Sequence, residues 1–236
     1  MISVVCWLWR DTQASSRSFE PQHVNVVQRM FARHLSRPHR FICVADNAAG
    51  FAPAVEVVKT PFAAMQAGLH RSPEGARFPS CYRRLWMFSK EATMLGERVL
   101  LIDIDLVVTR DVSPLFDRTE DFVGWQPFRD WGKQERFGGG IYLHTTGTRA
   151  HVWERFNGAR SIKEARLAGF RGSDQAWISY CLSATETRFA RDSGIYSIRD
   201  MAKREHVLPA DARLVQFNGP TKPWASPLPW VRTHFG

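Results

Sequence analysis

Residues 98–108 read RVLLIDIDLVV, and this stretch decides the fold that the chain is expected to adopt. An apolar run leads to Asp103, and a single apolar residue separates it from Asp105. A continuous apolar run is typical of a strand buried on both faces, as in a parallel sheet. Because charge is costly inside a sheet, two carboxylates at the end of the run predict a compensating cation.

Side chains two residues apart in a strand point to the same side, so Asp103 and Asp105 are expected to reach one ion. Oxygen ligands suit Mn²⁺ or Mg²⁺, and open α/β sheets bind ligands at the carboxyl ends of their strands. An Asp-x-Asp pattern also occurs by chance, so a pair without a metal is the alternative. The strongly apolar strand and the segment TRDVSPLF that follows at once (residues 109–116) favour the metal site.

The charge of the chain indicates what kind of partner it binds. Its 236 residues carry a formal net charge of +9, and the sequence pI is about 9.9. Such a balance predicts attraction to an anion, namely a nucleotide, an anionic membrane surface or a nucleic acid. Charge alone does not choose among these three.

The cysteines and the apolar runs indicate the compartment. Cys6, Cys43, Cys81 and Cys181 are far apart and form no Cys-x-x-Cys pair, so neither a zinc site nor a redox motif is indicated. Reduced cysteines fit a cytoplasmic location, with a peripheral position at the inner membrane face left open. No apolar run approaches the roughly 20 residues of a membrane helix. The first nine residues lack the features of a signal peptide and are predicted to be the first strand.

The order of the expected elements predicts an α/β fold with a parallel sheet. Strands are expected over 2–9, 41–45, 55–58, 121–125, 141–144 and 213–217, and helices over 21–37, 80–95, 148–156 and 173–182. Residues 59–79 and 157–171 show no clear period and are expected to be irregular. The chain is expected to form one domain, with a nucleotide-binding half over 1–116 and an acceptor-side half with the C-terminal tail over 117–236.

Four stretches resemble, in the same order, motifs of nucleotide-sugar glycosyltransferases with the A-type fold. The nearest resemblance is to glycosyltransferase family 8, which includes glycogenin and the lipooligosaccharide galactosyltransferases. The stretches are RVLLIDIDLVVTRDVSPLF (98–116), FGGGIYLH (137–144), GSDQAWIS (172–179) and VQFNGPTKPW (215–224). The segments VVCWLWRD (4–11) and PHRFICVAD (38–46) are similar to the first two strands of bacterial and phage members. Any one of these stretches is modest evidence, whereas four in order are strong.

The resemblance implies a Rossmann-like α/β fold with a mixed, mostly parallel central sheet flanked by helices. It also implies transfer of a sugar from a nucleotide sugar, with retention of configuration and with Mn²⁺ or Mg²⁺. The residues that it singles out are Asp174 and Gln175 for catalysis, Arg84, Asp103, Gly139, Gly140, Gly219 and Lys222 for the donor, and Asp103, Asp105 and Gln216 for the metal. Each has a plainer alternative: Arg84 and Lys222 as surface cations, the glycines as a hinge or a turn, and Asp174 as a partner of its own helix dipole.

Gln216 departs from the family pattern. The family's third metal ligand is a histidine, and Gln216 stands at the matching position. An amide oxygen binds Mn²⁺ or Mg²⁺ as a neutral and weaker donor. The expected result is weaker metal binding, with water or His234 of the tail as the alternative third ligand.

The sequence therefore predicts a metal-dependent, retaining glycosyltransferase that uses a nucleotide sugar, with a UDP-sugar favoured. The acceptor is an unidentified hydroxyl, as on a surface glycan or a lipooligosaccharide. One alternative is the same chemistry on modified DNA, which the positive charge allows. The other is a non-catalytic nucleotide- or nucleic-acid-binding domain, in which Gln216 marks the loss of activity.

Overall fold

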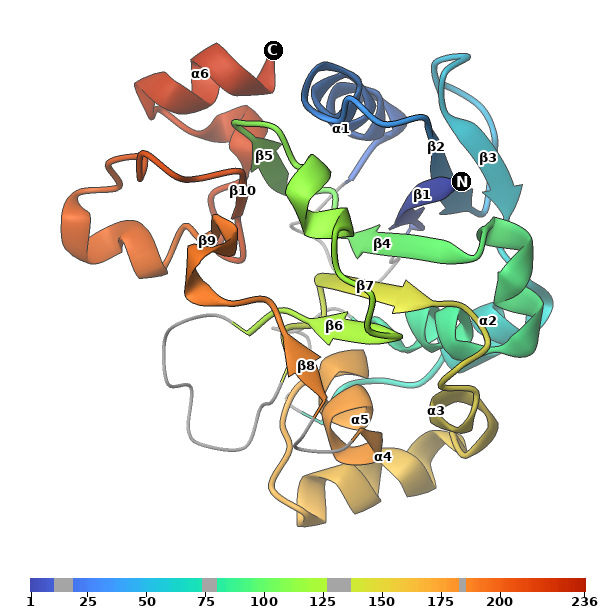
Figure 1. Ribbon diagram of the computed structural model, residues 1–236. Helices are drawn as coiled ribbons and strands as arrows, with labels where there is room; N and C mark the ends of the chain where they lie inside the picture. Colours follow the sequence, from blue (N-terminus) through green and yellow to red (C-terminus); the bar gives the residue numbers. More distant parts are fainter. Residues whose placement is uncertain (11–18, 74–79, 127–136, 183–185) are drawn as a thin grey trace.

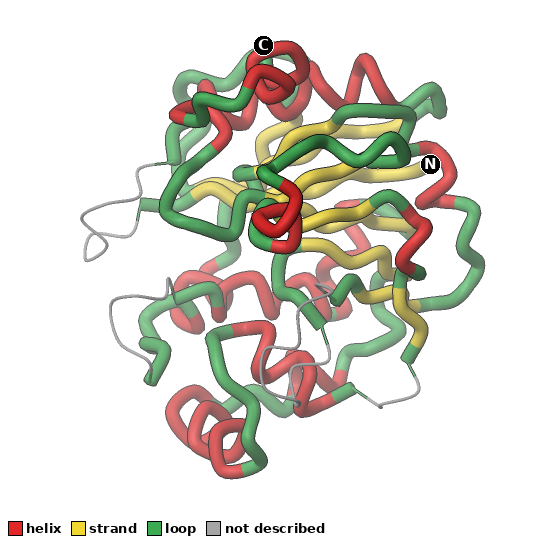
Figure 2. The backbone as a smooth tube through the Cα atoms, turned by 90° about the vertical axis from the view of Figure 1, so that its left-hand side faces the viewer, coloured by secondary structure: helices red, strands yellow, loops and turns green. Residues whose placement is uncertain are grey.

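A central sheet with helices above and below it forms the body of the protein (Figures 1 and 2). The computed structural model describes residues 1–10, 19–73, 80–126, 137–182 and 186–236. Within these residues the sheet has seven strands, in the order β3 (Glu56–Lys59), β2 (His39–Ala45), β1 (Ile2–Leu8), β4 (Arg98–Ile102), β7 (Ile141–Thr145), β6 (Phe122–Gly124) and β8 (Thr187–Arg188). All neighbours are parallel except that β7 is antiparallel to both β4 and β6. The expectation of a mixed, mostly parallel sheet is confirmed.

The strand order creates a switch point between β1 and β4. The chain moves outward from β1 through β2 to β3, and it then returns to the other side of β1 as β4. Ligands of open α/β sheets bind beyond the carboxyl ends of the strands at such a point. Asp103 follows the last residue of β4 directly, so the fold places it at this edge.

The two faces of the sheet are covered by different elements because successive strand residues point to opposite sides. On one face Val4 and Cys6 pack in a cluster with the apolar side of α1 (Pro21–His34). On the other face Val5 and Trp7 pack with the 3₁₀ helix η2 (Tyr82–Phe88). Helix α1 ends three residues earlier than expected, at His34.

The strand before the carboxylates is shorter than expected: the Asp103–Asp105 pair was predicted to end it, but β4 ends at Ile102 and both aspartates follow it. After β4 the chain leaves the large sheet and enters a second one, in which β5 (Leu106–Val108) pairs with β10 (Leu214–Gln216), and β10 pairs with β9 (Ile195–Ser197). The Asp103 amide donates to the Gly140 carbonyl at 2.9 Å, and the Phe217 amide donates to the Asp105 carbonyl at 2.7 Å. The carboxylates therefore lie at the junction of two sheets, where they avoid burial inside either one.

Two segments expected to be irregular contain helices instead. Helix α2 (Phe62–Ala67) lies within residues 59–79, of which 74–79 fall outside the described residues. Helix α4 (Gly158–Leu167) occupies most of 157–171 and packs against α5 (Asp174–Cys181). Its buried residues are Gly158, Ser161 and Ala165. Because these side chains are small, the buried face gives little apolar signal in the sequence.

The expected helix over 80–95 divides into η2 and a second 3₁₀ helix, η3 (Lys90–Leu95). Ser89 between them is extended, and its hydroxyl oxygen accepts from the Ala92 amide at 3.2 Å. The helix expected over 148–156 is shortened to α3 (His151–Glu154). The remaining helices are η4 (Ser113–Phe116), η5 (Arg191–Ser193), η6 (Asp200–Arg204), η7 (Pro223–Ala225) and α6 (Pro229–Phe235). In the described part of the chain, no helix combines the length and apolar character needed to cross a bilayer.

Candidate active site at the junction of the two sheets

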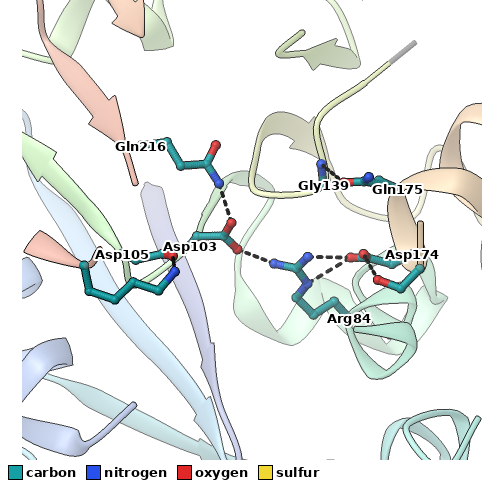
Figure 3. Close-up of polar contacts among 9 residues, drawn as sticks. Arg84, Asp103, Asp105, Gly139, Asp174, Gln175 and Gln216 are labelled. Atoms are coloured by element: carbon teal, nitrogen blue, oxygen red, sulfur yellow. Dashed lines mark hydrogen bonds and ion pairs between the residues drawn. The ribbon is translucent and has the colours of Figure 1, made fainter. Parts of the chain in front are cut away.

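Arg84 lies at the centre of the candidate site (Figure 3). It projects from η2 and its side chain is 8% exposed. Its Nε donates to Oδ2 of Asp174 at 2.9 Å, and its Nη2 lies 2.8 Å from the same oxygen. Its Nη1 donates to Oδ1 of Asp103. One guanidinium therefore joins the end of β4 to the first residue of α5.

The charges of this group depend on one another. Burial raises the pKa of Asp174, whereas the positive charge of Arg84 lowers it and the negative charge of Asp103 raises it. Burial lowers the pKa of Arg84, but the neighbouring carboxylates outweigh this and hold it well above its ordinary value. Arg84 is therefore always charged, and it is what makes a buried carboxylate at position 174 tolerable. The second oxygen of Asp174 accepts from the Ser173 hydroxyl at 3.1 Å.

Asp105 belongs to a second ion pair in the same site. The Lys222 ammonium donates to Oδ2 of Asp105 and, at 3.2 Å, to the Phe217 carbonyl. Both side chains are about nine-tenths buried. Burial and the charge of Asp103 raise the pKa of Asp105, and Lys222 lowers it. Each of the two carboxylates therefore has its own cation, Arg84 for Asp103 and Lys222 for Asp105.

Gln216 reaches the site from β10, in the small sheet. Its Nε2 donates to Oδ2 of Asp103, and the residue is buried. Asp103 thus accepts from Arg84 on one oxygen and from Gln216 on the other. The structure places Gln216 beside the first carboxylate of the Asp-x-Asp pair with its amide nitrogen toward Asp103, so the amide would have to turn for its oxygen to act as a third ligand.

The glycines before β7 leave room for these side chains. A Cβ at Gly139 would lie 3.2 Å from both Arg84 Nη2 and Asp174 Oδ1. The Gly139 amide donates to Oε1 of Gln175 at 3.4 Å. A Cβ at Gly140 would lie 2.1 Å from Asp103 Oδ2 and 2.2 Å from Gln216 Nε2. Only glycine at position 140 lets these two side chains meet.

We expect Gly140→Ala to separate Asp103 from Gln216 and to lower the free energy of unfolding by about 1–3 kcal/mol, as overpacking does. The matched control is Gly219→Ala, because a Cβ there would have its nearest neighbour, Arg199 Nε, 3.9 Å away. Gly219→Ala should change the unfolding free energy by less than about 0.5 kcal/mol. Denaturant unfolding of both variants measures the difference, and equal values would contradict the close approach at Gly140.

Most of the predicted site residues come together. Nine of them lie in this network of contacts: Arg84, Asp103, Asp105, Gly139, Gly140, Asp174, Gln175, Gln216 and Lys222. Gly219 makes no side-chain contact by its nature and has open space beside it. His234 lies instead on α6 against α1, where its carbonyl accepts from Arg33 Nη2 at 2.8 Å.

Three residues that support the site were not predicted. Gly172 has a φ of +110°, and a Cβ there would lie 2.6 Å from Gln175 Nε2, so this glycine keeps the Gln175 amide in place. Its position just before the Ser-Asp-Gln segment was the available signal. Phe19 and His23 hold the segment after Lys222: the His23 ring stacks on Trp224 at 3.8 Å, and Phe19 meets Trp224 edge-on at 5.6 Å. The roughly 200 residues between these partners leave no local signal in the sequence.

The donor set suits a divalent cation. Two carboxylates and an amide offer the hard oxygen ligands that Mn²⁺ and Mg²⁺ prefer. Among the described residues, no three His, Cys, Asp or Glu side chains gather as a metal site, so an amide is needed to complete the set. Gln216 adjoins Asp103, and the residues therefore fit the ion. A bound cation would replace Arg84 and Lys222 as the partner of these carboxylates.

Comparison with known proteins identifies the fold. No family model and no curated protein matches the chain. The galactosyltransferase LgtC, in complex with donor and acceptor sugar analogues, superposes with a TM-score of 0.63 at 16% identity, over 94% of this chain and 89% of that one. An active-site mutant of LgtC gives 0.63 at 14% identity, over 98% and 93%. The apo form of the glycosyltransferase GlyE of Streptococcus pneumoniae TIGR4 gives 0.60 at 13% identity, over 94% of this chain and 55% of GlyE. The chain therefore has the α/β fold of the A-type glycosyltransferases.

Proposed function

We propose that the protein is a glycosyltransferase that moves a sugar from a nucleotide sugar, with a UDP-sugar favoured, to a hydroxyl acceptor. The observation that carries this proposal is the buried network in which Arg84 joins Asp103 to Asp174 at the switch point of the sheet. Buried charges of this kind are costly and are typical of functional sites. The likeness in fold to LgtC and GlyE supports the same conclusion.

In the proposed reaction the leaving group is a nucleoside diphosphate, and the site has to stabilise its negative charge. A nucleoside diphosphate departs readily only when its developing negative charge is neutralised, and a divalent ion supplies that neutralisation as a Lewis acid. Asp103, Asp105 and Gln216 would hold the ion. Lys222 stands next to Asp105 as a compact positive charge suited to a phosphate. Lys222, which pairs with Asp105 in this structure, would contact the diphosphate.

Asp174 and Gln175 would act on the sugar. Asp174 is fixed by Arg84 and Ser173, and we propose that it binds sugar hydroxyls. Gln175 is fixed by the Gly139 amide at the neighbouring position. An amide is a poor nucleophile, so its proposed role is to position the anomeric carbon and to stabilise developing positive charge there. We propose retention of configuration, as in the family that the sequence resembles.

The wider assignment follows from the same proposal. We propose one glycosyltransferase domain over residues 1–236, with the nucleotide in the half over 1–116 and the acceptor in the half over 117–236. Cys6, Cys43, Cys81 and Cys181 are free thiols, which supports a cytoplasmic location.

Calorimetry with UDP, in the presence and absence of Mn²⁺, tests the proposal. We expect Mn²⁺ to tighten UDP binding, and a screen of nucleotide sugars to show slow donor hydrolysis. UDP binding without hydrolysis of any donor would favour a non-catalytic nucleotide-binding domain. Binding to duplex DNA with no binding of UDP would reject the proposal in favour of a nucleic-acid-binding domain.

We expect Gln216→His to tighten Mn²⁺ binding several-fold, which corresponds to about 1 kcal/mol. The reason is that an imidazole nitrogen is a better donor to Mn²⁺ than an amide oxygen, and residue 216 already lies against Asp103. Titrating Mn²⁺ into the donor-hydrolysis assay measures the change. Gln216→Ala is the control and should weaken the metal. If neither variant changes the Mn²⁺ dependence, residue 216 is not a ligand.

A further inference from the structure

A second concave feature lies outside the charged network described above. It is an open pocket of about 270 Å³ between α4 and the segment that follows α2. One wall consists of Ala159, Ile162, Lys163 and Arg166 of α4, and the other of His70, Arg71 and Pro73. In Figure 1, α4 lies at the bottom of the molecule, beside α5 and away from β5 and β10.

The two walls of the pocket are held at a fixed distance from each other. Positions 159, 162, 163 and 166 are spaced three and four residues apart, so they form one stripe along α4. The two walls touch at Gly158, where a Cβ would lie 2.3 Å from the His70 ring. Gly158 also has a φ of +45°, a conformation that favours glycine. The close contact fixes the distance between the walls.

The charges of the pocket point to an anion. Among the described residues, its lining holds Lys163, Arg166, Arg71 and His70 and no acidic residue. Throughout the described residues, neither Lys163 nor Arg166 has an acidic partner, whereas Arg160 on another side of α4 pairs with Glu164 at 3.0 Å. Like charges that share a concave surface raise the local positive potential and attract an anion. Ile162 gives the α4 wall of the pocket an apolar side chain, as ligand pockets commonly have.

The pocket shares wall residues with a small cavity at the start of α5. A small cavity of about 10 Å³ shares Pro73, Ile162 and Arg166 with it and is also lined by Gly172 and Ser173. Ser173 is the residue immediately before Asp174, and its hydroxyl donates to Asp174. A cavity of this volume holds about one water molecule, so it marks where the two spaces share walls and is not a path for a ligand.

We propose that this pocket binds the phosphate or carboxylate group of an anionic acceptor, near the N-terminal end of α5. The assignment to the acceptor rests on the proposed glycosyltransferase function, whereas the binding of an anion does not. Lys163 and Arg166 would contact the anion, and Ile162 would contact the apolar face of the attached sugar.

The first experiment uses inorganic phosphate as the probe, without any donor, and follows backbone amides by NMR. We expect saturable shifts at residues 158–166, and we expect the double variant Lys163→Gln/Arg166→Gln to weaken phosphate binding about tenfold. Arg160→Gln, on the same helix, is the matched control and should bind within about twofold of the wild type. Shifts only around Asp103 and Lys222, or equal affinities in the two variants, would overturn the anion site. Thermal unfolding confirms that each variant is folded.

The second experiment separates an acceptor from free phosphate. Binding of a hexose 6-phosphate, of the uncharged hexose and of inorganic phosphate is compared in the presence of UDP and Mn²⁺. We expect the hexose 6-phosphate to bind most tightly and to shift amides of both α4 and the first turn of α5. If it binds no more tightly than phosphate, the acceptor assignment is wrong. A failure of donor hydrolysis would reject the proposed function but would leave the phosphate titration on α4 unaffected.

Discussion

Replacing Asp103 with asparagine is expected to reduce nucleotide-sugar turnover by at least about a hundredfold. Asp103 is the carboxylate on which the site converges, since it accepts from Arg84 and from Gln216. Asparagine keeps the shape but removes the charge that would hold the divalent ion. The initial rate of UDP release from the donor, at saturating Mn²⁺, measures the effect.

The fold should survive this change, because the Asp103 side chain is 25% exposed and asparagine can still accept from Arg84. Asp117→Asn is a suitable control, since Asp117 forms a surface ion pair with Arg37 and its side chain is 59% exposed. It should change neither turnover nor stability appreciably. Asp105→Asn should also abolish turnover, but it leaves Lys222 buried without its charged partner and should destabilise the protein as well. Full activity of Asp103→Asn would refute the metal assignment.

Arg84→Met should lower the free energy of unfolding by about 3–5 kcal/mol at pH 7, because it removes the cation that compensates the buried carboxylate of Asp174. Burial already raises the pKa of Asp174, and Arg84 opposes that shift. Without Arg84 the folded state should hold a proton on Asp174 that the unfolded state releases. The stability of the variant then falls as the pH rises above the ordinary aspartate pKa of about 4. The deficit relative to the wild type should therefore shrink as the pH is lowered from 7.

Arg83→Met provides the matched control on the same 3₁₀ helix. Arg83 pairs at 3.1 Å with Asp46. The Arg83 side chain is 12% exposed, but Asp46 is 40% exposed and stays hydrated without it, so the loss should cost less than that of Arg84 and should vary little with pH. Urea unfolding at pH 5 and pH 7 compares the two variants. Equal, small losses for Arg84→Met and Arg83→Met would show that Arg84 is not the compensating charge for Asp174.

The local pattern around the Asp-x-Asp pair predicted much of the site. The apolar run before Asp103 and the order of strands and helices indicated the parallel sheet and the edge at which ligands bind. Consecutive glycines predicted a close approach of the backbone to a ligand, which stays a prediction; in the structure Gly140 adjoins the side chains of Asp103 and Gln216. The sheet and its ligand-binding edge could be predicted because strand burial depends on the pattern of apolar residues within a short segment, and that pattern is visible in the sequence.

Helix α4 was missed for a physical reason that the structure shows. Its buried side is formed by Gly158, Ser161 and Ala165, which fit against α5 because they are small. Because Gly, Ser and Ala are only weakly hydrophobic, the helical spacing of these buried residues does not appear as a hydrophobic period in the sequence. The same helix provides the basic pocket, so the error concealed the feature from which the anion site is inferred.

By itself, the sequence determined that a buried parallel strand leads to two carboxylates at the edge of the sheet where ligands bind. Only the tertiary structure decided that β4 and β5 belong to different sheets, that Arg84 joins Asp103 to Asp174, and that Lys222 pairs with Asp105. These contacts join residues that are between 19 and 117 positions apart. Which cation meets which carboxylate is set by how η2, α5 and the segment after β10 pack on the sheets. Pairing each buried carboxylate with a cation lowers the free-energy cost of burying charge. Because the two partners come from distant segments, no single segment of the sequence encodes the pairing.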